Sequence, residues 1–208
     1  LMMRMMESFF DIRRDSKALF DGLAITKHTD FCREWMNQYP VLMVSFKDVA
    51  GLNFDGAYGM LEDLIASTCA DHAYLEKSEK VSEKDSQSFA RLVRQSGNTS
   101  DIKNALLTLT RMLCAHYGKP VILLIDEYDV PLAKANEPKE GGERYYPQML
   151  DVMRGMLSTA LKGNGALKFG VVTGCLRIAK ESIFSGLNNF ASFSVLDDEF
   201  SRYFGFTE

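Results

Sequence analysis

Apolar and polar positions along the chain follow two different periods, which predict short buried strands separated by helices. Apolar residues at helical spacing predict a helix over 1–10, and Thr29 or Asp30 is expected to cap a second helix that runs to about Tyr39. The short apolar run at 41–46 then predicts a buried strand.

The stretch from 54 to 116 carries helical patterns and no comparable strand. We expect a solvated helical arm over the polar stretch 76–101, with a turn at Gly97-Asn98 and an isolated apolar patch; a specific binding element is the alternative interpretation. A clean amphipathic helix should follow and end at Gly118. The patch consists of Phe89, Leu92 and Val93, and the helix face of Ile102, Leu106, Leu109 and Leu113.

The strongest strand prediction is 121–125, an uninterrupted apolar run that is typical of a strand covered on both faces. The remaining predicted elements are a loop at Pro131 and 136–143, a helix at 146–161, a third strand at 169–173, a short helix near 178–184 and a weaker fourth strand at 193–196. Strands that alternate with helices predict an α/β fold with a mostly parallel sheet.

Candidate chemistry lies where these strands end. Asp126 and Glu127 directly follow the strongest strand, and in an open α/β sheet ligands bind at the carboxyl ends of strands. One acid could hold Mg²⁺ while the other orients or deprotonates a water, the pattern called Walker B. The alternative is a strand that ends at a charged, solvated turn.

Polar residues also follow the third strand. Thr173 is placed to help position an attacking water, and Arg177 to contact a phosphate. The alternative for Arg177 is a surface pair with Glu181 at helical spacing. A phosphate-binding loop of the form G-x-x-x-x-G-K-[ST] does not occur in the 208 residues.

Composition narrows the class of protein. The chain of 208 residues suits one domain, and its net charge of -4 offers no general attraction to nucleic acid. No apolar run reaches the roughly 20 residues needed to cross a bilayer. The four cysteines are widely scattered, which favours a reducing, cytoplasmic location over a disulfide framework or a zinc site.

Several segments together resemble the bacterial AAA-ATPase-like family. They are DSKALFDGL (15–23), YPV (39–41), SFKD (45–48), IDEYDVPL (125–132), TGCLRIAKESIFSGLNN (173–189) and FGFTE (204–208). They span essentially the whole chain in the family's order, and the last two long segments are the most specific.

The resemblance implies a three-layer P-loop NTPase fold of the AAA/ASCE type with strand order 5-1-4-3-2. The predicted strands at 41–46, 121–125, 169–173 and 193–196 would be strands 2 to 5. Residues 1–208 would form one domain, truncated at its N-terminus just past the P-loop, with a helical insertion at about 54–117. Strand 1 and the P-loop would then be missing, so the chain alone is expected to be inactive. Members often continue into a nuclease-like domain.

When the family's roles are carried over to this sequence, Asp126 would coordinate Mg²⁺ through water, and Glu127 would polarise the attacking water. Thr173 would be the sensor-type residue, and Arg177 a phosphate or transition-state contact. For Tyr128 a packing role explains the sequence as well as a chemical role does, and Asp129 could cap the turn that follows it. The expected function is an ATP-binding and hydrolysing module of a larger protein. The alternatives are a non-hydrolysing scaffold and, from the nuclease-like partner domain alone, nucleic-acid binding.

Overall fold

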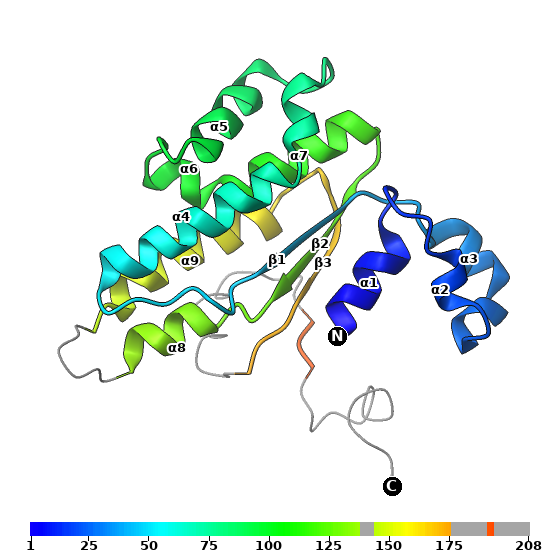
Figure 1. The fold of residues 1–208 in the computed structure, drawn as a ribbon, viewed down its shortest axis with the longest axis horizontal. Coiled ribbons are helices and arrows are strands. Elements are labelled where there is room, and N and C mark those ends of the chain that lie inside the picture. The colour runs from blue at the N-terminus through cyan, green and yellow to red at the C-terminus, as the bar shows by residue number, and fades with distance from the viewer. Residues whose placement is uncertain (138–143, 176–190, 194–208) are drawn as a thin grey trace, which may run out of the picture.

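A computed structural model describes residues 1–137, 144–175 and 191–193. Its centre is a parallel sheet of β1 (Val41–Ser45), β2 (Val121–Asp126) and β3 (Leu167–Val172), in the order β1-β2-β3 (Figure 1). The α/β fold and the three strands predicted here are confirmed. Their order is the one that the resemblance implies for strands 2, 3 and 4. The short helix expected near 178–184, and the fourth strand beyond Phe193, lie outside the described residues.

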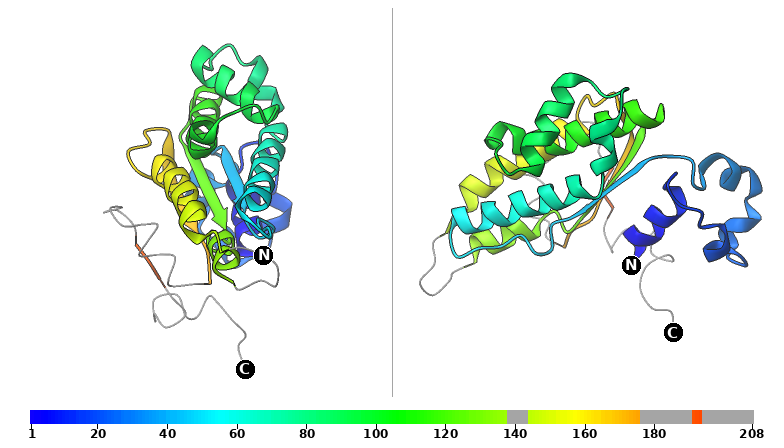
Figure 2. Two further views of the ribbon diagram at one scale, coloured as in Figure 1. Left: turned by 90° about the vertical axis from the view of Figure 1, so that its left-hand side faces the viewer. Right: turned by 45° about the horizontal axis from the view of Figure 1, so that its top comes forward.

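Helices cover both faces of the sheet. Helices α1 to α3 lie on one side, and the longer helices that follow β1 lie on the other (Figure 2). In chain order the helices are α1 (Met2–Phe10), α2 (Lys17–Phe20), α3 (Thr29–Trp35), α4 (Phe54–Ala70), α5 (Glu83–Val93), α6 (Thr99–Lys103), α7 (Ala105–Tyr117), α8 (Val130–Asn136) and α9 (Tyr146–Leu161), with short 3₁₀ turns at Ala24–Lys27 and Ala73–Lys77.

Side chains that alternate along the strands divide the interior into two cores. On one face Leu123 and Ile125 of β2 join the large core formed with α4, α7 and α9. On the other face Ile122 and Leu124 pack against apolar residues of α1. Every residue of 121–125 is 0% exposed, which explains why this strand reads as a continuous apolar run.

Two predictions are wrong, one about where a helix ends and one about a loop. The second helix was expected to reach about Tyr39, but α3 ends at Trp35, and Asn37 adopts a left-handed backbone with φ of 55° that cannot continue a helix. A loop was expected around Pro131, but this residue lies in the first turn of α8. Proline is tolerated there because the first-turn N–H groups have no intrahelical acceptor.

The helical arm is not an isolated solvated element. Phe89 and Leu92 of α5 are 1% and 2% exposed and belong to the large core, where α5 packs against α4 and α7. Only Val93 of the predicted patch is exposed. The many polar residues of α5 favoured a solvated helix in the sequence, although its large apolar side chains are buried.

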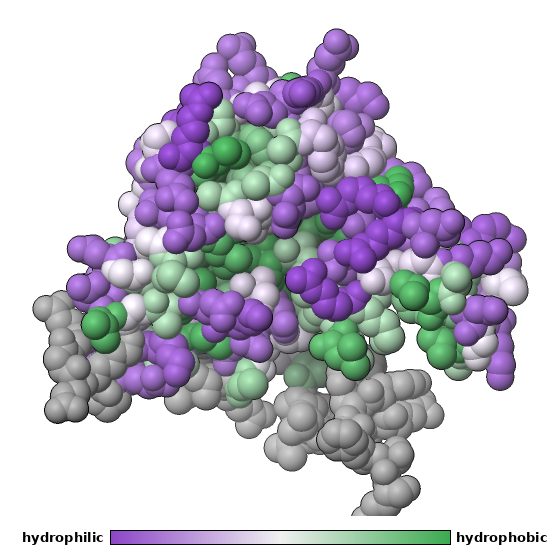
Figure 3. Space-filling view, in the orientation of Figure 1, coloured by the Kyte–Doolittle hydropathy of each residue, from purple (hydrophilic) through white to green (hydrophobic). Residues whose placement is uncertain are grey.

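The predicted helix at the start of the chain is found as α1, and only part of its apolar surface is buried. Met3, Phe9 and Phe10 are buried, whereas Met2 and Met5 are exposed. Trp35 is half-buried and stacks on Phe31, with ring centroids 5.8 Å apart. Apolar surface is accordingly visible over the region of α1 to α3 (Figure 3).

Within the described part of the chain, no helix is both long and apolar enough to span a membrane.

Candidate functional site

The carboxyl ends of the three strands are held in line by backbone hydrogen bonds. On one side of β2, the N–H of Phe46 donates to the carbonyl of Asp126 over 3.0 Å. On the other side, the N–H of Thr173 donates to the carbonyl of Ile125 over 2.8 Å. Asp126 therefore lies between the ends of β1 and β3, at the edge where α/β sheets bind ligands.

A side-chain hydrogen bond joins two of the predicted site residues. The Thr173 hydroxyl donates to Oδ1 of Asp126 over 2.5 Å. Such a short bond is typical of a hydroxyl that donates to a charged carboxylate. It fixes the orientation of the carboxylate and leaves its second oxygen for another partner. The structure brings these residues together, while the roles assigned to them stay predictions.

Glu127 leaves the strand with an unusual backbone. Its φ is 54°, in the left-handed region that residues other than glycine seldom adopt. The turn continues as the N–H of Val130 donates to the Glu127 carbonyl over 3.2 Å. The half-buried Glu127 carboxylate has no hydrogen-bond or ion-pair partner among the described residues. Strained residues of this kind cluster at functional sites.

Ser45 is a site residue that the sequence reasoning missed. It pairs in register with Asp126, so the two side chains leave the sheet on the same face. Its hydroxyl oxygen is buried and has no hydrogen-bond partner in the described chain. A buried polar atom without a partner calls for a ligand, water or ion. The one sequence feature that could have pointed to Ser45 is its position at the end of the first predicted strand.

Tyr128 and Asp129 hold the segment that follows β3. Oδ2 of Asp129 accepts a hydrogen bond from the N–H of Cys175 over 2.8 Å. A Cβ added to Gly174 would lie 2.6 Å from both Asp129 Oδ1 and a ring carbon of Tyr128, so glycine allows this close approach. Burial, with the nearby Asp129 charge, raises the pKa of Tyr128 to about 12. The packing interpretation of Tyr128 fits this geometry.

The suggested capping role of Asp129 is wrong in its detail. Asp129 occupies the position before α8, but its side chain makes no capping hydrogen bond to that helix. The carboxylate is 2% exposed and turns instead toward the backbone after β3. Asp129 therefore links the turn after β2 to the turn after β3.

The N-terminus of α1 points to the same edge of the sheet. At its other end, the carbonyl of Phe10 accepts from the N–H of Tyr39 over 3.1 Å, just before β1 begins. The 9 residues of α1 and the 5 of β1 correspond to lengths of about 13 and about 16 Å. The helix thus runs back along the strand, and its first turn lies near the strand ends (Figure 1).

The first turn of α1 can attract an anion. Leu1 precedes the helix and gives it no side-chain cap, and no acidic residue lies in the first turn. Its N–H groups and the positive end of the helix dipole therefore favour negative charge.

Two predicted features lie outside this arrangement. Arg177, and with it the alternative pair with Glu181, falls outside the described residues. Within the described residues, no group of three or more His, Cys, Asp or Glu side chains could by itself hold a metal ion. A cation at this edge would therefore need further oxygen ligands from groups other than these carboxylates.

The fold is an α/β protein with a parallel sheet, and Asp126 lies at the carboxyl end of its central described strand, between Ser45 and Thr173 of the neighbouring chain segments. In open α/β sheets this edge is where ligands bind. The family model of predicted AAA-ATPases matches residues 1–184, and the chain belongs to this family.

The chain is also similar to an uncharacterized protein in the vnfD 5′ region of Azotobacter chroococcum mcd 1. The two are 25% identical over 206 residues, which cover 98% of this chain and 34% of the relative. The chain therefore spans about a third of the length of this curated relative. No solved structure matches this chain.

Proposed function

We propose that this chain is the ATP-binding and hydrolysing module of a larger protein. The observation that carries the proposal is the Thr173–Asp126 hydrogen bond of 2.5 Å at the carboxyl edge of the sheet. It orients a carboxylate toward the edge where the first turn of α1 favours anions. Membership of the predicted AAA-ATPase family supports the same conclusion.

The residues at this edge fit a Mg²⁺ ion. Mg²⁺ prefers carboxylate, hydroxyl and water oxygens, and it usually keeps several waters. Asp126 offers its second carboxylate oxygen, and the buried Ser45 hydroxyl lacks a partner in the described chain. Asp126 would hold the ion through water, with Ser45 and Thr173 bonded to that carboxylate or to those waters. The ion would neutralise phosphate charge.

Glu127 is the proposed residue for the attacking water. Its carboxylate has no partner among the described residues, so it is free to accept a proton or a hydrogen bond from water. The left-handed backbone with φ of 54° aims its side chain differently from that of Asp126. Thr173 then keeps the neighbouring carboxylate in place, and Arg177 is proposed to contact a phosphate.

A non-hydrolysing scaffold is the second candidate function. It is the alternative in which the full-length protein has no working phosphate-binding loop; the resemblance places that loop before the 208 residues, which contain no G-x-x-x-x-G-K-[ST] sequence. In that case the fold would serve as a platform for a protein partner. In either case the effector would belong to the rest of the longer protein, for which the nuclease-like domain implied by the resemblance is the candidate.

Nucleotide binding and turnover in the full-length protein separate the two functions. In the ATPase, Glu127→Gln should keep Mg²⁺-dependent ATP binding and lower turnover by about 10²- to 10⁴-fold. Glu137→Gln is the matched control, because Glu137 is an exposed glutamate that pairs with Lys134 at the end of α8. Failure of the unmodified protein to bind ATP would favour the scaffold.

A further inference from the structure

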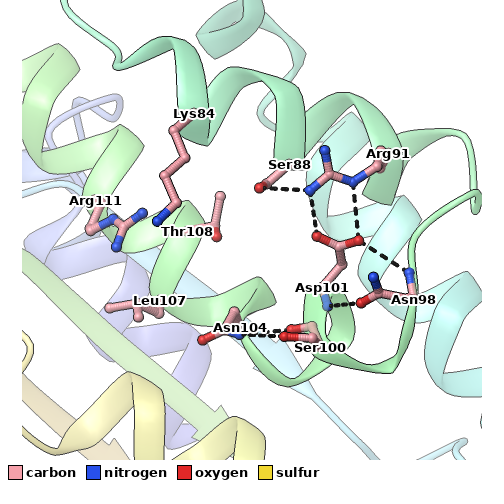
Figure 4. Close-up of a pocket in the computed structure, with 10 residues that line it drawn as sticks. All are labelled: Lys84, Ser88, Arg91, Asn98, Ser100, Asp101, Asn104, Leu107, Thr108 and Arg111. Carbon is pink, nitrogen blue, oxygen red and sulfur yellow. Dashed lines mark hydrogen bonds and ion pairs between the residues drawn. The ribbon is translucent and has the colours of Figure 1, made fainter.

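A polar pocket of about 370 Å³ lies between α5, α6 and α7 (Figure 4). The size is within the range of small-molecule sites. Its lining includes three basic side chains and one carboxylate, and Leu107 is its only apolar residue within the described chain. None of the lining residues comes from the sheet, so this pocket is separate from the carboxyl edge described above.

At one end of the pocket, the charged side chains pair with each other. Arg91 donates to both carboxylate oxygens of Asp101, over 3.1 and 2.7 Å, and also to the Ser88 hydroxyl over 3.1 Å. Asp101 in turn accepts from the backbone N–H of Asn98 over 3.1 Å. The positive and negative charges therefore cancel there, and this end offers hydroxyl and amide groups rather than net charge.

The other end carries an excess of positive charge. The ammonium of Lys84 points toward the space beside Thr108 and the Arg111 guanidinium (Figure 4). Lys84 is exposed and has no hydrogen-bond or ion-pair partner in the described chain. Two like charges directed to one space repel each other, and an anion between them would turn the repulsion into attraction.

Arg111 has a carboxylate partner that leaves one of its N–H donors unpaired in the described chain. It forms an ion pair with Asp85, whose other carboxylate oxygen accepts from the Ser82 hydroxyl over 2.8 Å. The Nε of Arg111 is buried and has no acceptor among the described residues. Asp85 therefore does not satisfy every donor of this guanidinium, and because Arg111 lines the pocket, an oxyanion there could accept from its exposed nitrogens.

We propose that this pocket binds a small, highly polar molecule through a phosphate or carboxylate group. The oxyanion would lie between Lys84 and Arg111 and accept from the Thr108 hydroxyl. The rest of the molecule would reach toward Ser88 and Asn104, which offer a hydroxyl and an amide. The scarcity of apolar lining disfavours an apolar ligand. This inference does not depend on the ATPase proposal.

The test is a titration of the ¹⁵N-labelled protein with inorganic phosphate, in parallel with acetate, at constant ionic strength. We expect saturable shifts of the Arg111 Nε–H signal and of backbone amides in α5, α6 and α7. Lys84→Gln should raise the dissociation constant at least about fivefold. Saturation by phosphate alone, or by acetate as well, identifies which oxyanion the pocket prefers, and either result supports the site.

Lys77→Gln is the matched control, because Lys77 is an exposed lysine that precedes α5 and does not line the pocket. It removes the same charge and should leave the dissociation constant within about twofold. Equal weakening by both substitutions would mean general charge attraction and would overturn the proposal. Shifts that do not saturate, or that centre elsewhere on the protein, would also overturn it.

Discussion

Buried His72 should make the fold sensitive to mild acid. The side chain is 3% exposed, and its Nδ1 lies 3.3 Å from Arg13 Nη1 and 3.2 Å from the Tyr74 hydroxyl oxygen. Burial and the Arg13 charge lower the pKa of His72 to about 4, although the carboxylate of Asp11 opposes them. The neutral imidazole is therefore the form that the fold accepts.

The sign of the effect follows from the two pKa values. An unfolded histidine titrates near 6.5, and folded His72 near 4, so the unfolded chain binds the proton first. The stability contributed by neutral His72 is complete above pH 6.5 and is lost as the pH falls toward 4. Between about pH 7.5 and about pH 5, the loss in free energy of unfolding is about 2 kcal/mol.

Urea unfolding followed by circular dichroism at several pH values measures this loss. His72→Asn removes the titrating group, so its free energy of unfolding should fall much less over the same range. His28→Asn, at an exposed histidine, should keep the full dependence. If the His72 variant loses as much stability in acid as the unmodified protein, another group causes the sensitivity and the reasoning is wrong.

This prediction also bears on the proposed site. Arg13 bridges His72 to the carboxylate of Asp11, over 3.3 and 2.8 Å, and Asp11 directly follows α1. Protonation of His72 would therefore loosen the segment that holds α1 along β1. Because the first turn of α1 lies near the strand ends, we expect anion binding there to weaken in acid before the whole fold is lost.

Two further predictions concern the strand ends. Thr173→Val removes the hydroxyl that donates to Asp126; the exposed position should keep stability within about 1 kcal/mol, while ATP turnover falls more than ATP binding. Gly174→Ala places a Cβ 2.6 Å from Asp129 Oδ1, which should cost about 1–3 kcal/mol in urea unfolding, whereas Gly165→Ala, with nothing within 4 Å of its added Cβ, should cost little.

Matched variants make both results interpretable. Thr26→Val removes an exposed hydroxyl that bonds a nearby backbone carbonyl and should leave turnover unchanged. Equal losses of ATP binding and turnover in Thr173→Val would contradict a role in positioning the carboxylate. For Gly174→Ala, stability equal to that of Gly165→Ala would show that the turn adapts without cost.

The sheet could be predicted from the sequence because burial on both faces leaves an unmistakable pattern. The run 121–125 is apolar at every position, and it forms the strand that is fully covered. The helix predicted at 146–161 is found as α9 with the same bounds. By contrast, α8 was missed because the proline in its first turn and the charged, glycine-bearing stretch 136–143 are also typical of a loop.

The candidate site could be predicted only in part. Asp126 and Thr173 were placed at strand ends by pattern, and pairing then brought their side chains into contact. The contribution of Ser45 depends on the register between β1 and β2, and this register cannot be predicted from the local sequence pattern. The left-handed backbone of Glu127 depends on the neighbouring strand, since the next N–H along the chain donates to the Thr173 carbonyl over 3.1 Å.

The sequence by itself determined the class of fold, the three described strands of its sheet and the acidic pair at the end of the most buried strand, because these follow from local periodicity and from residue type. Only the tertiary structure decided which side chains meet. Segments far apart in the sequence lie together at the strand ends and in the His72 cluster, and the packing of three consecutive helices forms the pocket of α5, α6 and α7. Such contacts depend on strand register and helix packing, which are set by the folded chain as a whole.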